Sequence, residues 1–142
     1  MTTRFKLVVV DDHPLVRRGI VESLSDDQAF HVVGEGAHTE DAVDLSRSLR
    51  PHLIFLDVNM PGGGGVVAAT RIRADEPLVK IAMFSFRQDL AIVRACFTAG
   101  ASGYIVKGVS GSELVAMSHR ILAGETVVDP EIARRLSLDG SS

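Results

Sequence analysis

The chain has 142 residues, a net charge of -3 and an ordinary globular composition, with 46% hydrophobic and 23% charged residues. This length suffices for one domain with a full core, and the acidic balance gives no sign of the basic patch that nucleic-acid-binding modules usually carry. The lone Cys96 excludes an internal disulfide and indicates a packed thiol in a reducing compartment. The sequence shows no signal peptide and no apolar run of membrane-spanning length, so we expect a cytoplasmic protein without membrane partners.

Apolar runs alternate with helical patterns along the chain. Strands are expected over 5–10, 31–37, 53–57, 79–84 and 104–106. Helices are expected from Pro14, behind caps at Thr39, Asp89 and Ser110, and over 66–74. Four glycines precede the helix over 66–74 and should loosen its start.

Five strand–helix units in strict alternation predict an α/β fold with a parallel sheet, helices on both faces and right-handed crossovers. We expect a flavodoxin-like, doubly wound (βα)5 sheet of five strands in the order 2-1-3-4-5, because a (β/α)8 barrel needs about 250 residues. The pattern changes after Gly124, where a stub over 126–128 and a short helix over 130–136 precede a polar, frayed tail. We therefore divide the chain into a domain over 1–124 and the start of a linker over 125–142.

Charged and polar residues follow the ends of several predicted strands. The apolar run over 53–56 leads into Asp57, Asp11 and Asp12 follow the first strand, Ser85 ends the fourth, and Lys107 follows the fifth. The carboxyl ends of parallel strands share one edge of the sheet, which is where open α/β sheets place their ligands. Taken singly, each residue is an ordinary cap, turn former or solvated charge, so the prediction depends on the combination.

Three close carboxylates repel one another and therefore take up protons or bind a cation. Oxygen ligands suit Mg²⁺, whereas the five histidines are scattered and do not suggest zinc. Asp57 beside a metal can attack phosphorus, while Lys107 pairs with a phosphoryl oxygen and Ser85 donates a hydrogen bond to another. The predicted chemistry is phosphoryl transfer onto Asp57, which forms an acyl phosphate.

The chain resembles the receiver domain of bacterial two-component response regulators over about residues 5–123. The resemblance rests on the acidic pair, Asp57 with the Met-Pro-Gly that follows it, Ser85, and the run AGASGYIVK over 99–107. It implies a phosphorylation-activated switch that takes its phosphoryl group from a sensor histidine kinase. The implied roles are phosphoacceptor for Asp57, Mg²⁺ ligands for Asp11, Asp12, Asp57 and the main-chain carbonyl of Asn59, switch hydroxyl for Ser85, phosphate-pairing lysine for Lys107, and switch aromatic for Tyr104.

The run DDHPLVRRG over 11–19 and the run PEIARRL over 130–136 are similar to the NarL/FixJ subfamily. Its members carry a LuxR-type helix-turn-helix domain after this linker, so we expect transcription control and promoter binding only through a domain that this chain lacks. We expect Ser85 to move toward the phosphoryl group, Tyr104 to turn inward behind it, and the protein to form homodimers. The pairing surface is left open between the first and fifth helices and the face of the fourth helix, fifth strand and fifth helix.

Three features depart from the receiver pattern. Gly108 follows the lysine where many receivers have proline, which makes that loop more mobile. Phe86 follows Ser85 where small residues are common, and it can narrow access to Asp57. Arg87, also near the mouth of the site, can affect the lifetime of the phosphate. The third departure is the run of four glycines over 62–65.

Two other classes of function are considered. A haloacid-dehalogenase-type phosphatase also uses a strand-end Asp, a Ser, a Lys and Mg²⁺, but it typically has a second Asp two residues after the nucleophile, where this chain has Asn59. A receiver-like interaction module that is never phosphorylated would have lost the acidic pair or the lysine, and both are present here. We therefore expect a switch that catalyses only its own phosphorylation and dephosphorylation.

Overall fold

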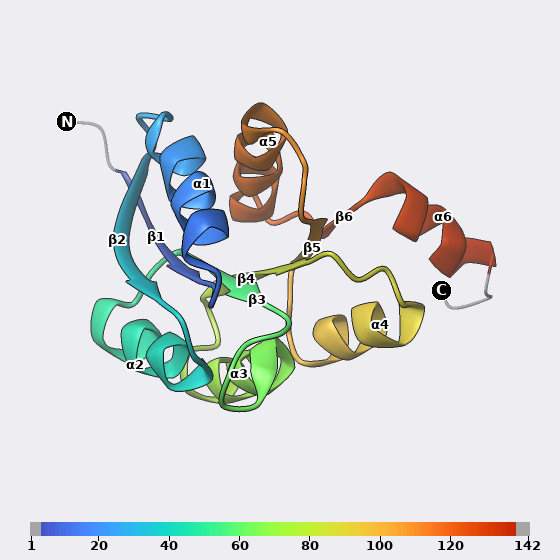
Figure 1. Cartoon of the computed structure of the whole chain (residues 1–142), viewed down its shortest axis with the longest axis horizontal. Coiled ribbons are helices and arrows are strands. Elements are labelled where there is room, and N and C mark those ends of the chain that lie inside the picture. The colour runs from blue at the N-terminus through green and yellow to red at the C-terminus, as the bar shows by residue number, and fades with distance from the viewer. Residues whose placement is uncertain (1–3, 139–142) are drawn as a thin grey trace.

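The structure is a computed structural model that describes residues 4–138, so the expected fraying over 139–142 lies outside the described residues. A parallel sheet forms the centre of the molecule, with helices on both faces (Figure 1). The strands are β1 (Phe5–Val10), β2 (Phe30–Gly36), β3 (Leu53–Asp57), β4 (Lys80–Ser85), β5 (Gly103–Val106) and β6 (Val127–Val128). The helices are α1 (Pro14–Ser25), α2 (Thr39–Leu49), α3 (Gly64–Asp75), α4 (Leu90–Thr98), α5 (Gly111–Leu122) and α6 (Pro130–Leu138).

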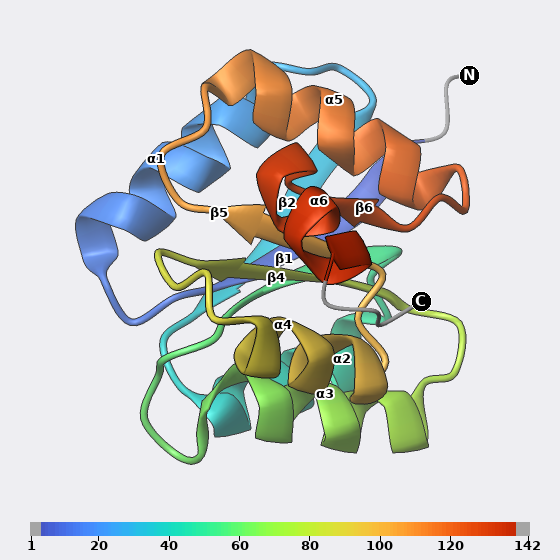
Figure 2. The ribbon, with the colours of Figure 1, turned by 90° about the vertical axis from the view of Figure 1, so that its right-hand side faces the viewer.

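The strand order is β2-β1-β3-β4-β5-β6, which confirms the doubly wound fold and the predicted order of its first five strands. The stub after α5 is a sixth strand, β6, which pairs in parallel with β5. Figures 1 and 2 show α1 and α5 on one face of the sheet and α2, α3 and α4 on the other. None of the helices in the described part of the chain is long and apolar enough to cross a membrane.

The core has two apolar layers, one on each face of the sheet. Successive residues of a strand point to opposite faces, so Leu7 packs in the α1–α5 layer and Val8 in the α2–α3–α4 layer. β3 lies between β1 and β4 and is buried throughout, as expected of a central parallel strand. Cys96 is a free thiol buried in the second layer, and burial raises its pKa to about 11. The expectation of a packed thiol is confirmed.

Some predicted helix starts need correction. Thr39 is the first residue of α2, and the N-cap is His38. The Thr39 hydroxyl is instead used across the fold, donating to the carbonyl of Gly64 at 3.1 Å. Asp89 is the N-cap of α4 but makes no capping hydrogen bond, since its carboxylate pairs with Arg87. Ser110 does cap α5, accepting a hydrogen bond from the amide of Glu113.

The glycine run over 62–65 shapes the turn after β3. Gly62, Gly63 and Gly64 have φ values of +96°, +121° and +84°, a region that side chains disfavour. α3 begins at Gly64, two residues earlier than predicted, so two of the four glycines lie inside the helix. A Cβ on Gly65 would lie 2.5 Å from the main-chain oxygen of Asp57 and 2.6 Å from Cε of Met83. Only glycine lets α3 approach the end of β3 this closely.

Replacing Gly65 with alanine should therefore lower the free energy of unfolding by about 1–3 kcal/mol, the range expected for overpacking. Gly19 provides the matched control, because it lies in α1 and a Cβ added there would meet nothing within 4 Å. Gly19→Ala should stabilise the protein by about 0.5–1 kcal/mol through helix propensity. Urea unfolding followed by circular dichroism measures both, and an equal response of the two variants would contradict the close approach of α3 to β3.

Candidate functional site

Asp57 is the last residue of β3 and is only 2% exposed. On one side β3 pairs with β1, whose last residue, Val10, lies opposite Leu56. Asp11 therefore follows directly beside Asp57 and is 1% exposed. The predicted gathering of strand-end carboxylates at one edge of the sheet is found in the structure.

Lys107 brings one positive charge into this cluster. Its Nζ lies 2.9 Å from Oδ2 of Asp11 and 3.2 Å from Oδ1 of Asp57, and its side chain is 4% exposed. The main chain of Lys107 is held at the end of β4, because its amide donates to the carbonyl of Ser85 at 2.8 Å. One buried ammonium is thus shared between two buried carboxylates that approach it from different strands.

Asp12 and His13 complete the cluster at its open side. One ligand atom from each of Asp11, Asp12, His13 and Asp57 lies within 4.8 Å of the others. His13 was not predicted: its Nδ1 is 3.0 Å from Oδ1 of Asp12 and 3.8 Å from Oδ2 of Asp57. The signal was its position directly after the acidic pair, where the chain is still at the edge of the sheet.

The cluster has the donor set of a cation site. Oδ2 of Asp57 is buried and accepts no hydrogen bond from any residue in the described part of the chain. Such an atom is unfavourable unless a cation or a proton reaches it. Carboxylate oxygens from Asp11, Asp12 and Asp57 are hard ligands, so these residues fit a metal ion that prefers oxygen. The acidic pocket could therefore bind a metal, as expected.

Burial and, after it, the charge of Asp11 raise the pKa of Asp57 to about 6, against the opposing effect of Lys107. A carboxyl with this pKa is still ionised at neutral pH, so Asp57 keeps a nucleophilic oxygen. The buried charge of this ionised form lowers the free energy of unfolding, because desolvation disfavours the charged carboxylate.

Asn59 and the turn after β3 form one wall of the mouth. The main-chain amide of Asn59 donates to Oδ1 of Asp57 at 3.2 Å, which holds the carboxylate in position. Asn59 and Asp12 line the same open hollow of about 490 Å³, together with Met60 and Pro61. The structure therefore brings Asn59 to the same side of the cluster as Asp12.

Ser85, Arg87 and Tyr104 form a linked group on the other side of Asp57. The Arg87 amide donates to Oγ of Ser85 at 2.9 Å, and the Tyr104 hydroxyl donates to the Arg87 carbonyl at 2.8 Å. Tyr104 is fully buried, and burial raises its pKa. The inward position of this ring, expected only after phosphorylation, is therefore already adopted by the unmodified chain.

Phe86 and Arg87 lie where access to the site was predicted to be modulated. Phe86 is 67% exposed, and its ring centroid is 5.4 Å from Nζ of Lys107, within the range of a cation–π contact. The Arg87 guanidinium turns away to Asp89, with Nη2 at 3.1 Å from Oδ2. Phe86 is therefore the side chain of this pair that contacts the charged cluster.

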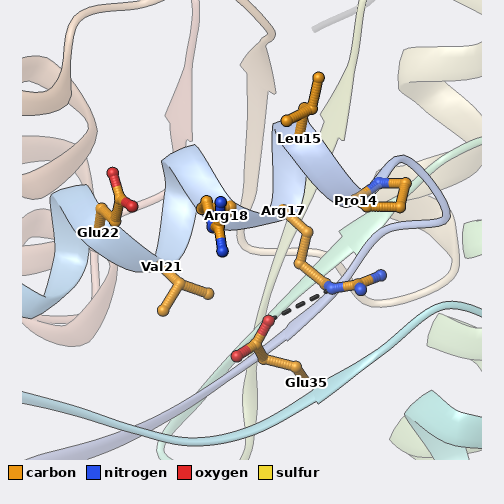
Figure 3. A pocket seen from close by; sticks show the side chains of 7 residues that line it. All are labelled: Pro14, Leu15, Arg17, Arg18, Val21, Glu22 and Glu35. Carbon is orange, nitrogen blue, oxygen red and sulfur yellow. Dashed lines mark hydrogen bonds and ion pairs between the residues drawn. The ribbon is translucent and has the colours of Figure 1, made fainter.

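A second hollow, of about 510 Å³, runs along the exposed side of α1 (Figure 3). Arg17 crosses it to pair with Glu35, at 3.3 Å between Nε and Oε1. Leu15 stands at its rim and is 82% exposed. The residues that line this hollow begin at Pro14, two residues after the acidic pair, and include none of the carboxylates of the cluster. Arg17 links the two regions, because its Nη1 donates to the main-chain carbonyl of Asp11 at 2.7 Å.

Comparisons with known proteins agree with this arrangement. Residues 7–119 match the family described as the response regulator receiver domain. The chain is 36% identical over 133 residues to the response regulator GacA of Pseudomonas aeruginosa, covering 94% of this chain and 62% of that protein. It is 39% identical over 128 residues to the response regulator protein VraR of Staphylococcus epidermidis, covering 89% of this chain and 61% of that protein.

A crystal structure of a LuxR-family two-component response regulator from Aurantimonas sp. SI85-9A1 superposes with a TM-score of 0.92 and 33% identity. The match covers 99% of this chain and 100% of that one. By contrast, the chain spans about three fifths of the length of the curated relatives named above.

The raised pKa of Asp57 predicts that removing its charge stabilises the fold. Above pH 6 the Asp57 carboxylate is ionised in both the folded and the unfolded state, and its charge destabilises the folded state. As pH falls from about 6 to 4, the carboxyl takes up its proton in the folded state first, so this destabilisation decreases. Because the pKa rises from 3.8 to about 6, at ~1.4 kcal/mol per pKa unit Asp57→Asn should raise the free energy of unfolding by about 3 kcal/mol at pH 7.5, and by much less at pH 4.5.

Urea unfolding at the two pH values measures the effect. Asp26→Asn is the control, because Asp26 is an exposed carboxylate at the end of α1. A destabilised Asp57→Asn variant, or a gain that does not depend on pH, would contradict the strained charge at this position.

Proposed function

Because this chain belongs to the response regulator receiver domain family, we propose that Asp57 is the phosphoacceptor of a two-component signalling switch. The observation that carries the proposal is the shared ammonium of Lys107, 2.9 Å from Asp11 and 3.2 Å from Asp57. An ammonium in this place can exchange its contact with Oδ1 of Asp57 for a phosphoryl oxygen on the same side chain. The family consists of signalling proteins, and the only reactions proposed for this chain are its own phosphorylation and dephosphorylation.

We propose Mg²⁺ as the metal, held by Asp11, Asp12, Asp57 and the main-chain carbonyl of Asn59. When bound, Mg²⁺ would neutralise charge on the phosphoryl oxygens. The chain itself supplies the nucleophile: Asp57, ionised at neutral pH, forms a new O–P bond while the bond from phosphorus to the donor nitrogen breaks. The main-chain amide of Asn59 orients the attacking carboxylate.

The product adds roughly 1.5 to 2 negative charges at the end of β3, by analogy with other phosphorylated side chains. Ser85 is proposed to donate its hydroxyl proton to a phosphoryl oxygen, while its Oγ can still accept from the Arg87 amide. Tyr104 then stabilises the same loop from within. Since its inward position exists before phosphorylation, the switch is a shift in population between conformations that the chain already visits.

The donor is proposed to be a phosphohistidine on a sensor kinase, which must approach the open side of the cluster. The hollow along α1 offers that partner the exposed Leu15, three residues after Asp12 in the chain (Figure 3). The reaction belongs in the cytoplasm, where kinases have ATP and where the free Cys96 stays reduced.

The proposed output is dimerisation and, in a longer protein, transcription control through a helix-turn-helix domain that binds promoter DNA. The GacA and VraR relatives exceed this chain in length, which fits a receiver over 1–124 and a linker from 125 onward. The dimer surface is proposed to be either α1 with α5 or the face of α4, β5 and α5. No DNA contact is assigned to the residues of this chain.

The alternatives predict different products from the same incubation. With acetyl phosphate and Mg²⁺, intact mass should show one phosphoryl group on the wild type, lost slowly, and none on Asp57→Asn or after chelation. No adduct on the wild type would favour an interaction module that is never phosphorylated. Rapid consumption of acetyl phosphate without an adduct would favour a phosphatase of the haloacid-dehalogenase type.

Phe86 provides a second prediction, on the lifetime of the phosphate. If its ring covers Lys107 and narrows access, Phe86→Ala should let water in and shorten the lifetime of the acyl phosphate by about three- to tenfold, a range that corresponds to ~0.6–1.4 kcal/mol. Phe86→Tyr keeps an aromatic face over the ammonium and should retain the wild-type lifetime.

Leu78→Ala is the matched control, because Leu78 is another large apolar residue, 90% exposed, in the segment between α3 and β4. The decay of the phosphorylated mass after removal of acetyl phosphate gives the lifetime. Equal lifetimes for Phe86→Ala and Leu78→Ala would show that the ring does not protect the site.

A further inference from the structure

The loop between β4 and α4, residues 86–89, is held from two directions. From inside, the Tyr104 hydroxyl donates to the carbonyl of Arg87 at 2.8 Å. From outside, Nη1 of Arg135 donates to the carbonyl of the next residue, Gln88, at 2.7 Å. Two adjacent main-chain carbonyls of the loop that follows the switch hydroxyl are therefore bound by two different elements, β5 and α6.

α6 is packed firmly enough for this contact to have an effect. Ile132 of α6 is fully buried in the apolar layer that also contains Val93 of α4 and Tyr104. Leu136, one residue after Arg135, packs against the same layer. Figure 2 shows α6 beside α4 at the edge of the sheet. The apolar anchor fixes the helix, so the arginine is presented to the loop in a defined position.

The loop also contacts the hydroxyl that is proposed to respond to phosphorylation. The Arg87 amide, on the same residue whose carbonyl binds Tyr104, donates to Oγ of Ser85. The contacts thus form one continuous path from α6 to the Ser85 hydroxyl, through Arg135, Gln88 and Arg87. A hydrogen bond from a charged donor is stronger than one between neutral groups, so the Arg135 contact favours this loop conformation over others.

We propose that Arg135 is a positioning residue for the phosphorylation switch: it acts through the Gln88 carbonyl to hold the loop of Ser85 in the conformation in which Tyr104 points inward. Docking of α6 and phosphorylation of Asp57 then favour the same conformation, and each strengthens the other by the same factor. For the phosphorylation arm of its test, this inference rests on the proposed function. It assigns to α6 a part in the switch in addition to any role as a connector.

The chain offers a matched pair of arginines for the test. Arg134 precedes Arg135 in α6, but its guanidinium pairs with Glu131 in the same helix, with Nε at 3.0 Å from Oε2. Arg135→Met and Arg134→Met remove the same charge from the same helix and keep an unbranched apolar stem. Only the first removes the contact with the loop.

The first readout needs no ligand. Amide hydrogen exchange over 86–89 should be faster in Arg135→Met than in Arg134→Met or the wild type, because the loop loses one of its two supports. Equal exchange in the two variants would overturn the inference, whether or not Asp57 is ever phosphorylated. Unchanged exchange in the central strands confirms that each variant is folded.

The second readout uses beryllofluoride with Mg²⁺ as a phosphoryl mimic. The half-saturating concentration should be about three- to tenfold higher for Arg135→Met than for the wild type, and within about twofold for Arg134→Met. Binding by the wild type should also slow amide exchange over 131–136. If the wild type binds no beryllofluoride, the proposed function fails while the exchange experiment still decides the role of Arg135. If both variants bind like the wild type, the coupling is wrong.

Discussion

The ammonium of Lys107, placed between Asp11 and Asp57, is the interaction on which the rest of the site depends. Two carboxylates that are each at most 2% exposed would repel each other strongly without it. The fold provides this arrangement because β1, β3 and β5 end at one edge of a parallel sheet. The single ammonium does not fully compensate the two carboxylates. The pKa of Asp57 stays raised to about 6, and Oδ2 of Asp57 has no hydrogen-bond partner among the described residues. The site is therefore prepared for further positive charge and for a reaction that changes its own charge.

Asp57 has a rigid structure on one side and a loop that can change conformation on the other. On the rigid side, Gly65 lets α3 approach the main chain of Asp57 so closely that no side chain fits between them. On the adjustable side, Ser85 is followed by a short loop whose carbonyls are bound by Tyr104 and Arg135. A change of charge at Asp57 would therefore be transmitted through this loop toward β5 and α6, and would leave α3 in place. This asymmetry fits a protein that signals by conformational change.

Much of the fold and the site could be predicted because strand ends are visible in the sequence. Apolar runs that stop at an acid, a serine or a lysine place those residues at one edge once the sheet is known to be parallel, so Asp57, Ser85 and Lys107 were placed correctly. The contribution of His13 was missed because a single histidine shows no ligand pattern. Tyr104 was expected to turn inward, but only after phosphorylation. Its hydrogen bond to the Arg87 carbonyl and the contact of Arg135 with Gln88, 47 residues away, could not be predicted, because both involve main-chain carbonyls that any residue type supplies. The start of α3 was misplaced because the glycines that break most helices are here needed for close packing.

The measurement that tests the central claim most directly is the location of the phosphoryl group among the three clustered carboxylates. Borohydride reduces an aspartyl phosphate to homoserine, so a peptide map after treatment with acetyl phosphate, Mg²⁺ and borohydride marks the residue that carried it. The account predicts homoserine at position 57 alone, with Asp11 and Asp12 unchanged. Homoserine at position 11 or 12, or a phosphoryl group that resists borohydride and maps to His13, would contradict the assignment of Asp57 as the acceptor.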